Sequence, residues 1–148
     1  MMLDIIYHYE NEAAAEAAYD AAKAAGNQES MAAAIAKHEA LEQAAEDKGR
    51  EFCFMLRLYT EMKERGNALI DLNDVHDFQV AEAVEILLKY GTRRFTFSST
   101  WSSAVSAAWE IGQHGYKLEG MVQINSQFFK IHSDERQKIP AFVFSINE

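Results

Sequence analysis

Cysteine and proline are almost missing from this sequence, since Cys53 and Pro140 each occur once in 148 residues. A single cysteine cannot form an internal disulfide or build a zinc site of several cysteines, and it favours a reducing compartment. The lone proline stands where a strand is expected to begin, a position that its missing N–H permits.

Long apolar runs are also missing. No run approaches the roughly 20 residues that cross a bilayer. The opening MMLDIIYHYENE has no basic segment, and Asp4 and His8 interrupt its apolar residues, so it does not resemble a signal peptide. With 49% hydrophobic and 25% charged residues, the composition is typical of a folded globular protein. We therefore expect a cytoplasmic protein that does not enter a membrane.

Basic residues are outnumbered, with 14 lysines and arginines against 23 aspartates and glutamates and a net charge of −9. Residues 1–85 hold 18 acidic and 7 basic side chains, a balance of −11, whereas residues 86–148 hold 5 and 7, a balance of +2. Phosphate contacts need clustered lysine and arginine, so nucleic-acid binding is not expected. Six basic residues of the second part, near Phe128 and Phe129, are interpreted as a solvated sheet edge. They are Arg93, Arg94, Lys117, Lys130, Arg136 and Lys138.

Alanine dominates the first part, with 16 of the 23 alanines within the first 45 residues. Because alanine loses no side-chain entropy in a helix, the sequence predicts a helix over Asn11–Ala25, and residues 1–10 are expected to continue it. Gly26-Asn27 tolerate the left-handed conformation that ends a helix. A second helical stretch is predicted from Ser30 to Arg65, with a break at Lys48-Gly49. The two stretches predict a helical hairpin.

The second part reads as alternating strands and helices. The stretch from Asn73 to Lys89 has an apolar helical face, with Asn73 or Asp74 as its expected cap. Arg93–Ser98 alternates as a strand does, and a helix is predicted over Trp101–His114. YKLEGMVQIN and PAFVFSI are the next predicted strands, with QFFKI as a possible extra one. Two parallel strands joined by a helix would form a βαβ unit.

Together these patterns predict an α+β protein in which an acidic, alanine-rich helical hairpin and a further helix pack beside a sheet of three or four strands. No linker or repeat divides the sequence. We expect a single domain over residues 1–148, with a mostly helical layer over 1–90 and a β-α-β-β layer over 91–148.

The cluster SSTWSS is the first candidate site. Its members are Ser98, Ser99, Thr100, Trp101, Ser102 and Ser103. The hydroxyl groups precede a predicted helix, whose N-terminus favours negative charge, so a phosphate or carboxylate is one possible ligand. The alternative is structural, with Ser99 or Thr100 capping the helix. The glycines that cradle phosphate are missing, and so is the elbow of a nucleophilic serine. Arg93 and Arg94 lie on the order of 16 Å before Ser99 along an extended strand, too far to help hold an anion.

The segment DLNDVHD is the second candidate, since Asp71, Asp74, His76 and Asp77 are residue types that bind divalent metals. Their spacing matches neither HExxH nor an EF-hand, and acidic residues are also favoured in a first helical turn. Asp74, His76 and Asp77 are therefore only weak metal candidates, and no cofactor is predicted.

Three functions remain open from the sequence. The first is a non-enzymatic interaction or accessory protein that associates with itself, because the helix faces are rich in small, methionine and aromatic residues and no catalytic set converges. The second is a small anionic-ligand-binding domain or enzyme that uses the turn at residues 98–103. The third is an acidic mimic of DNA, or a docking protein for a basic partner, in which Glu12, Glu16, Glu42 and Glu46 supply charge.

Overall fold

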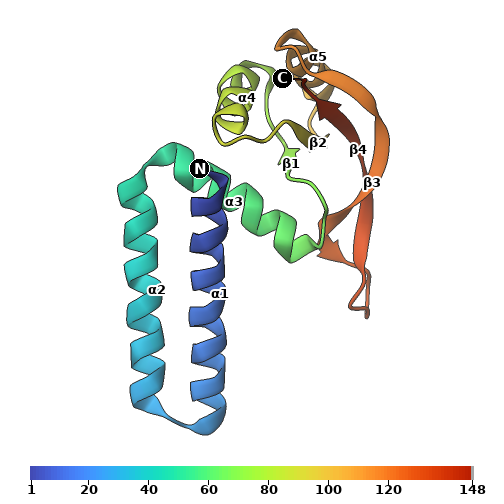
Figure 1. Ribbon diagram of the computed structural model, residues 1–148. Helices are drawn as coiled ribbons and strands as arrows, with labels where there is room; N and C mark the ends of the chain where they lie inside the picture. Colours follow the sequence, from blue (N-terminus) through green and yellow to red (C-terminus); the bar gives the residue numbers. More distant parts are fainter. Residues whose placement is uncertain (148) are drawn as a thin grey trace. The chain divides into compact units, whose positions relative to one another are not determined.

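The computed structural model describes residues 1–147, which belong to two compact units. The first unit is Met1–Arg57 and the second begins at Leu58, so the division falls inside the third helix. The elements, in chain order (Figure 1), are α1 (Met2–Ala25), α2 (Gln28–Lys48), α3 (Arg50–Arg65), β1 (Asp71–Asn73), the short 3₁₀ helix η1 (Asp77–Gln79), α4 (Val80–Lys89), β2 (Arg94–Ser98), α5 (Ala104–Gln113), β3 (Lys117–Phe129) and β4 (Arg136–Ser145). Helices and a four-stranded mixed sheet make this an α+β protein, as predicted. The single-domain organisation stays a prediction.

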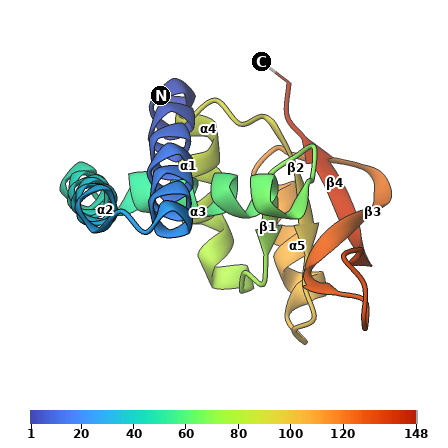
Figure 2. The same cartoon turned by 90° about the horizontal axis from the view of Figure 1, so that it is seen from below.

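Helices α1 and α2 form the predicted antiparallel hairpin and lie side by side (Figure 2). Helix α1 already begins at Met2, so the opening ten residues are helical as expected. Gly26 ends it with a left-handed φ of 67°, and the Asn27 side chain caps α2 by accepting a hydrogen bond from the Ser30 N–H at 3.0 Å. The buried seam consists largely of alanines, whose small side chains allow the helices to approach closely. They are Ala15, Ala22, Ala34 and Ala45.

The predicted break between α2 and α3 is confirmed at Gly49, which has a φ of 101°. Phe52, just after the break, is buried, and its ring makes an edge contact with the buried His8 ring at 5.6 Å. Cys53 is half-buried and its Sγ–H donates to the Ala45 carbonyl at 3.3 Å. These contacts tie the start of α3 to the hairpin.

The sheet has the strand order β1-β2-β4-β3. Strands β1 and β2 pair in parallel through η1 and α4, whereas β4 is antiparallel to both β2 and β3. Strands β2 and β3 are consequently parallel, but β4 lies between them. The βαβ unit with adjacent strands is therefore β1-α4-β2, whose first strand was not predicted.

One face of the sheet is aromatic and carries much of the second unit's core. Phe95 and Phe97 of β2 are fully buried, and their partners on β4, Phe144 and Phe142, share the same face. Helix α5 lies against this face, since it lines a hollow together with those two β4 residues. Helix α4 contacts α5. The opposite face of β1 and β2 is polar.

The predicted cap of the fourth helix is wrong. Neither Asn73 nor Asp74 caps it, because η1 precedes α4 and His76 stands at the start of η1. The Gln79 N–H donates to the His76 carbonyl at 2.9 Å, and Gln79 Oε1 accepts from the His76 N–H at 3.0 Å. This reciprocal pair starts the helical segment at Asp77, after Asn73 and Asp74.

The β3-β4 hairpin also departs from the expected bounds. Strand β3 continues through the first residues of QFFKI, and β4 starts at Arg136, so Pro140 lies inside a strand rather than at its start. Strand β2 pairs with β4 no farther than Phe142. Pro140 therefore has a strand on one side only, which is where a residue without an N–H is tolerated.

Replacing the Asn27 cap should destabilise the hairpin. We expect Asn27→Ala to lower the free energy of unfolding by about 1 kcal/mol, because the Ser30 N–H loses its acceptor. Urea denaturation followed by far-UV circular dichroism measures the loss. Gln28→Ala is the control, and equal destabilisation by both substitutions would contradict the capping role.

Candidate functional site

The polar face of the sheet is built around a buried carboxyl group, Asp71. Strand register places Asp71 beside Thr96 and Asn73 beside Ser98, so all four share one face. Asp71 Oδ1 accepts a hydrogen bond from Thr96 Oγ1 at 2.7 Å, and its Oδ2 accepts one from Ser98 Oγ at 2.6 Å. Only 5% of Asp71 is exposed. Two short hydrogen bonds thus offset part of the cost of removing this carboxyl from water.

Burial is the main reason why the pKa of Asp71 rises from its ordinary 3.8 to about 6. The hydrogen bonds from Ser98 and Thr96 and the positive charge of Arg65 lower it, while the charge of Glu61 raises it. Desolvation exceeds these favourable contacts. Asp71 therefore exchanges its proton close to neutral pH.

The end of α3 supplies two further charged groups. Glu61 Oε2 accepts from Asn73 Nδ2 at 3.3 Å and lies 3.8 Å from Arg65 Nη2. The Arg65 side chain is only 12% exposed. Helix α3 thus brings one guanidinium group to the polar face.

The turn after β2 is held by Asp74. The Asp74 N–H donates to the Ser98 carbonyl at 3.0 Å, and its Oδ1 accepts from the Thr100 N–H at 3.2 Å. These bonds hold Asp74 in a left-handed conformation with a φ of 47°, which aspartate tolerates better than most residues. The Trp101 N–H is also engaged, by Ser99 Oγ at 3.1 Å.

A hollow of about 430 Å³ opens at the carboxyl ends of β1 and β2. Ligands of α/β proteins often bind at this edge of parallel strands. Its lining includes the predicted Ser98, Ser99 and Thr100, together with Arg65 and Asp74. The other lining residues are Asn73, Ser126, Gln127, Phe128, Ile139 and Pro140.

The rest of the predicted cluster lies elsewhere. The Trp101 ring stacks on His76 with centroids 4.3 Å apart, and Ser103 Oγ lies 3.1 Å from His76 Nδ1. Ser102 is exposed. Helix α5 starts at Ala104, so the expected capping by Ser99 or Thr100 is wrong. Their polar groups belong to the turn instead.

The three weak metal candidates point to different partners. Asp74 binds the Thr100 N–H, His76 binds Ser103, and Asp77 Oδ1 accepts from the Phe78 N–H at 2.9 Å. Within residues 1–147, no three histidine, cysteine, aspartate or glutamate side chains are grouped as metal ligands.

The hairpin carries a second, acidic hollow of about 480 Å³ between α1 and α2. His38 bridges two of its glutamates, with Nδ1 2.9 Å from Glu12 and Nε2 3.0 Å from Glu42. The Glu12 carboxylate is the main cause that raises the pKa of His38, and Glu42 adds to it. Glu16 and Glu39 also line this groove.

Sequence reasoning missed most of the surroundings of Asp71. Glu61 and Arg65 read only as charged residues near the end of a helix, and Ser126 and Phe128 as parts of a strand. One usable signal was present, because Asp71 directly follows the apolar residues ALI and is therefore a candidate for burial. The alternating Thr96 and Ser98 are its natural partners on a neighbouring strand.

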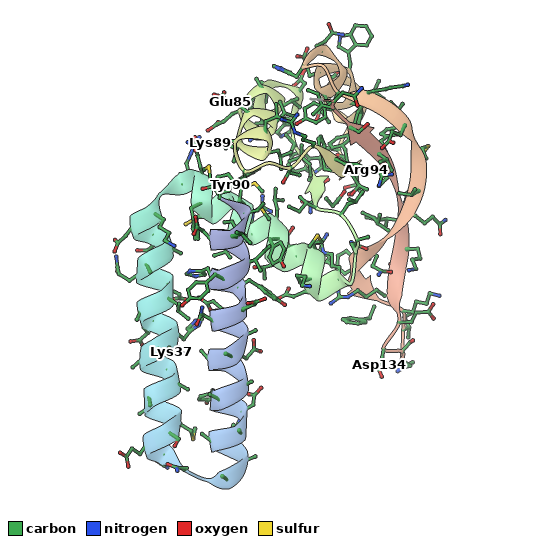
Figure 3. All side chains as sticks on the ribbon, viewed as in Figure 1. Lys37, Glu85, Lys89, Tyr90, Arg94 and Asp134 are labelled. Atoms are coloured by element: carbon green, nitrogen blue, oxygen red, sulfur yellow. The ribbon has the colours of Figure 1, made fainter. Side chains whose placement is uncertain are left out.

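Neutralising Asp71 should remove a pH-dependent loss of stability. A carboxyl whose folded pKa is raised contributes stability that is present below its unfolded pKa, near 3.8, and is lost as the pH rises through about 6. A pKa shift of about two units corresponds to roughly 3 kcal/mol of unfolding free energy. We expect Asp71→Asn to gain about that much relative to the wild type across this window, as measured by urea denaturation. Asp134→Asn, in the exposed β3-β4 turn (Figure 3), should show no such trend. A difference independent of pH would contradict the assignment.

Residues 54–146 match the family described as a domain of unknown function, DUF7698. No curated protein and no solved structure matches the chain. The matched segment contains β1 to β4 and the hollow at the carboxyl ends of β1 and β2, and it spans well over half of the sequence. The chain is therefore a member of the DUF7698 family.

Proposed function

We propose that this protein is a non-enzymatic interaction protein of the cytoplasm that pairs with a second copy of itself along the outer edge of β3. The observation that carries the proposal is that β3 is an exposed edge strand. Strand β3 is terminal in the sheet (Figure 1), with β4 as its neighbour on one side. A terminal strand presents unpaired backbone N–H and C=O groups, which can bind another strand.

The first half of β3 is exposed on both of its faces. All seven residues from Lys117 to Gln123 are exposed, and Met121 and Val122, which point to opposite faces, are 62% and 42% exposed. Exposed apolar side chains on an edge strand favour association.

Charge does not protect this edge. From Gly120 to Phe129, ten successive residues carry no charged side chain. Glu119 lies just before this run, and its Oε2 is paired with Arg94 Nε at 2.7 Å. Irregular pairing with β4 between Leu118 and Gly120 marks one end of the regular stretch, and Asn67 binds the backbone of Asn125 at the other. A regular, uncharged segment of edge remains between them.

A second copy suits this edge because a strand can pair with itself in an antiparallel arrangement around a two-fold axis. Such an axis is perpendicular to the sheet, so α5 of each copy lies on the same face. Next to β3 on that face is a hollow of about 370 Å³, whose lining includes Val105, Trp109 and Leu118. These apolar side chains add area toward the 1,200–2,000 Å² or so that a stable interface buries.

A lysine on the edge should separate the copies. We expect the wild type to behave as a dimer in light scattering coupled to gel filtration. Met121→Lys should weaken the dimer by about tenfold or more, or ~1.4 kcal/mol, because pairing would bury an unpaired charge. Val122→Lys, on the opposite face, should weaken the dimer to a similar extent. Contact through one face of the sheet would instead be weakened by only one of the two substitutions.

Ile131→Lys is the matched control, because Ile131 is exposed in the turn beyond β3. It should leave the dimer intact, and circular dichroism should show all three variants folded. A wild type that stays monomeric over the whole concentration range would refute the proposal. So would a dimer that neither edge variant weakens.

The acidic groove favours a second candidate function, the docking of a basic protein. Residues 1–49 hold ten acidic and three basic side chains, a balance of −7. The groove combines Glu12, Glu16, Glu39 and Glu42 with an apolar floor that includes Ala15 and Ile35. That combination complements a segment with basic and apolar side chains.

Neutralising the groove should abolish such docking. The fourfold variant has Gln in place of the four glutamates that line the groove, Glu12, Glu16, Glu39 and Glu42. We expect it to lose binding of a lysine-rich amphipathic peptide by at least about tenfold in fluorescence anisotropy, because the attraction between opposite charges disappears. The control replaces Glu10, Asp20, Glu29 and Asp47 by amides and has the same net charge. Equal binding losses in the two variants would show that only the overall charge matters, and would contradict docking in the groove.

A further inference from the structure

We propose that the hollow at the carboxyl ends of β1 and β2 binds a small zwitterion of the α-amino acid type with an apolar side chain. Its volume of about 430 Å³ lies within the range of small-molecule sites, about 300–1,000 Å³. The inference does not depend on pairing through β3.

The backbone of the turn does not offer a simple anion site. An anion beside Ser98–Ser103 would need free backbone N–H groups. The Thr100 N–H already donates to the Asp74 carboxylate, and the Trp101 N–H to Ser99 Oγ. The protein's own acceptors therefore occupy two of the N–H groups that a phosphate would use, and Asp74 adds a negative charge to the hollow.

The lining instead holds one charge of each sign, Arg65 and Asp74. Glu61 approaches Arg65 only to 3.8 Å, beyond a normal hydrogen bond, so the guanidinium keeps donors for a ligand carboxylate. Asp74 uses Oδ1 for Thr100. A carboxylate accepts at both oxygens, so Oδ2 is available for a ligand ammonium group.

The floor of the hollow fits the same ammonium group. Ser98 Oγ directs its hydrogen to Asp71 Oδ2 at 2.6 Å, which leaves the oxygen's lone pairs as acceptors. Opposite β2, Phe128, Ile139 and Pro140 form an apolar wall. A ligand with a carboxylate, an ammonium group and an apolar side chain satisfies Arg65, Asp74 and this wall together.

The two charges of the ligand can be tested one at a time. L-Leucine is compared with isoamylamine, which lacks its carboxylate, and with 4-methylpentanoate, which lacks its ammonium group. Inorganic phosphate is the simple anion, and L-phenylalanine and L-methionine vary the side chain. We expect at least one of the three amino acids to raise the thermal midpoint, because binding to the folded state stabilises it, and the single-charge analogues and phosphate to have little effect.

Variants locate the binding. We expect Arg65→Gln and Asp74→Asn each to weaken binding of the best amino acid by at least about tenfold in titration calorimetry. Asparagine retains the acceptor for the Thr100 N–H, so the turn should stay folded. Arg65→Lys keeps the charge without the planar fork and should bind with intermediate affinity. Arg94→Gln, at the other end of β2, is the control and should bind as the wild type does.

Several results would overturn the inference. It fails if none of the three amino acids shifts the midpoint, or if leucine gives no larger shift than the amine or the acid, because one charge then suffices. It also fails if phosphate binds and the amino acids do not, or if binding is unchanged in Arg65→Gln and Asp74→Asn. The measurements can be repeated on Met121→Lys, so failure of self-association leaves this test intact.

Discussion

The hydrogen bonds between Asp71 and β2 are the constraint on which the second unit depends. Strand β1 has only three residues, and so short a strand gains little from its ladder alone. Thr96 and Ser98 add two side-chain bonds to its pairing with β2. Breaking them would leave a buried, unsatisfied carboxyl, which costs more than the bonds contribute. The interaction thus fixes the register of β1 and, with it, the positions of Asn73 and Asp74 beside the hollow.

The same interaction carries a cost that most core residues avoid. A leucine at this position would bury no charge. Burial of the charged Asp71 carboxylate is unfavourable, and it raises the pKa of this group to about 6. Such shifts are common where a protein binds or reacts with small molecules. Asp71 does not line the hollow, but Ser98 both lines it and donates to Asp71. The protonation state of Asp71 therefore affects the hydrogen bonding of Ser98 in the hollow.

Composition and periodicity were sufficient to predict most of the helices and strands, but not their caps. Alanine content and Gly26 predicted the hairpin, and alternating Phe95 and Phe97 predicted β2, because these signals act within a few residues. The site could be predicted only in part. Asp71 and Ser98 are 27 residues apart, and their contact depends on the parallel pairing of β1 with β2, which no local pattern encodes. The caps failed for a related reason, since Asp74 binds the distant Thr100 instead of its own helix.

The β3-β4 hairpin connects the two proposals made for the second unit. Strand β3 has thirteen residues and β4 has ten, whereas β2 has five. The hairpin therefore extends past the end of β2, where Phe128 and Pro140 form the wall of the hollow. Insertion of β4 beside β2 also leaves β3 at the edge. A single feature of topology, the placement of a long return strand in the middle of the sheet, thus underlies both the proposed pairing of β3 and the proposed binding of a small ligand. Pairing along β3 would restrain the hairpin and, because ordering a wall in advance lowers the entropic cost of binding, favour occupation of the hollow.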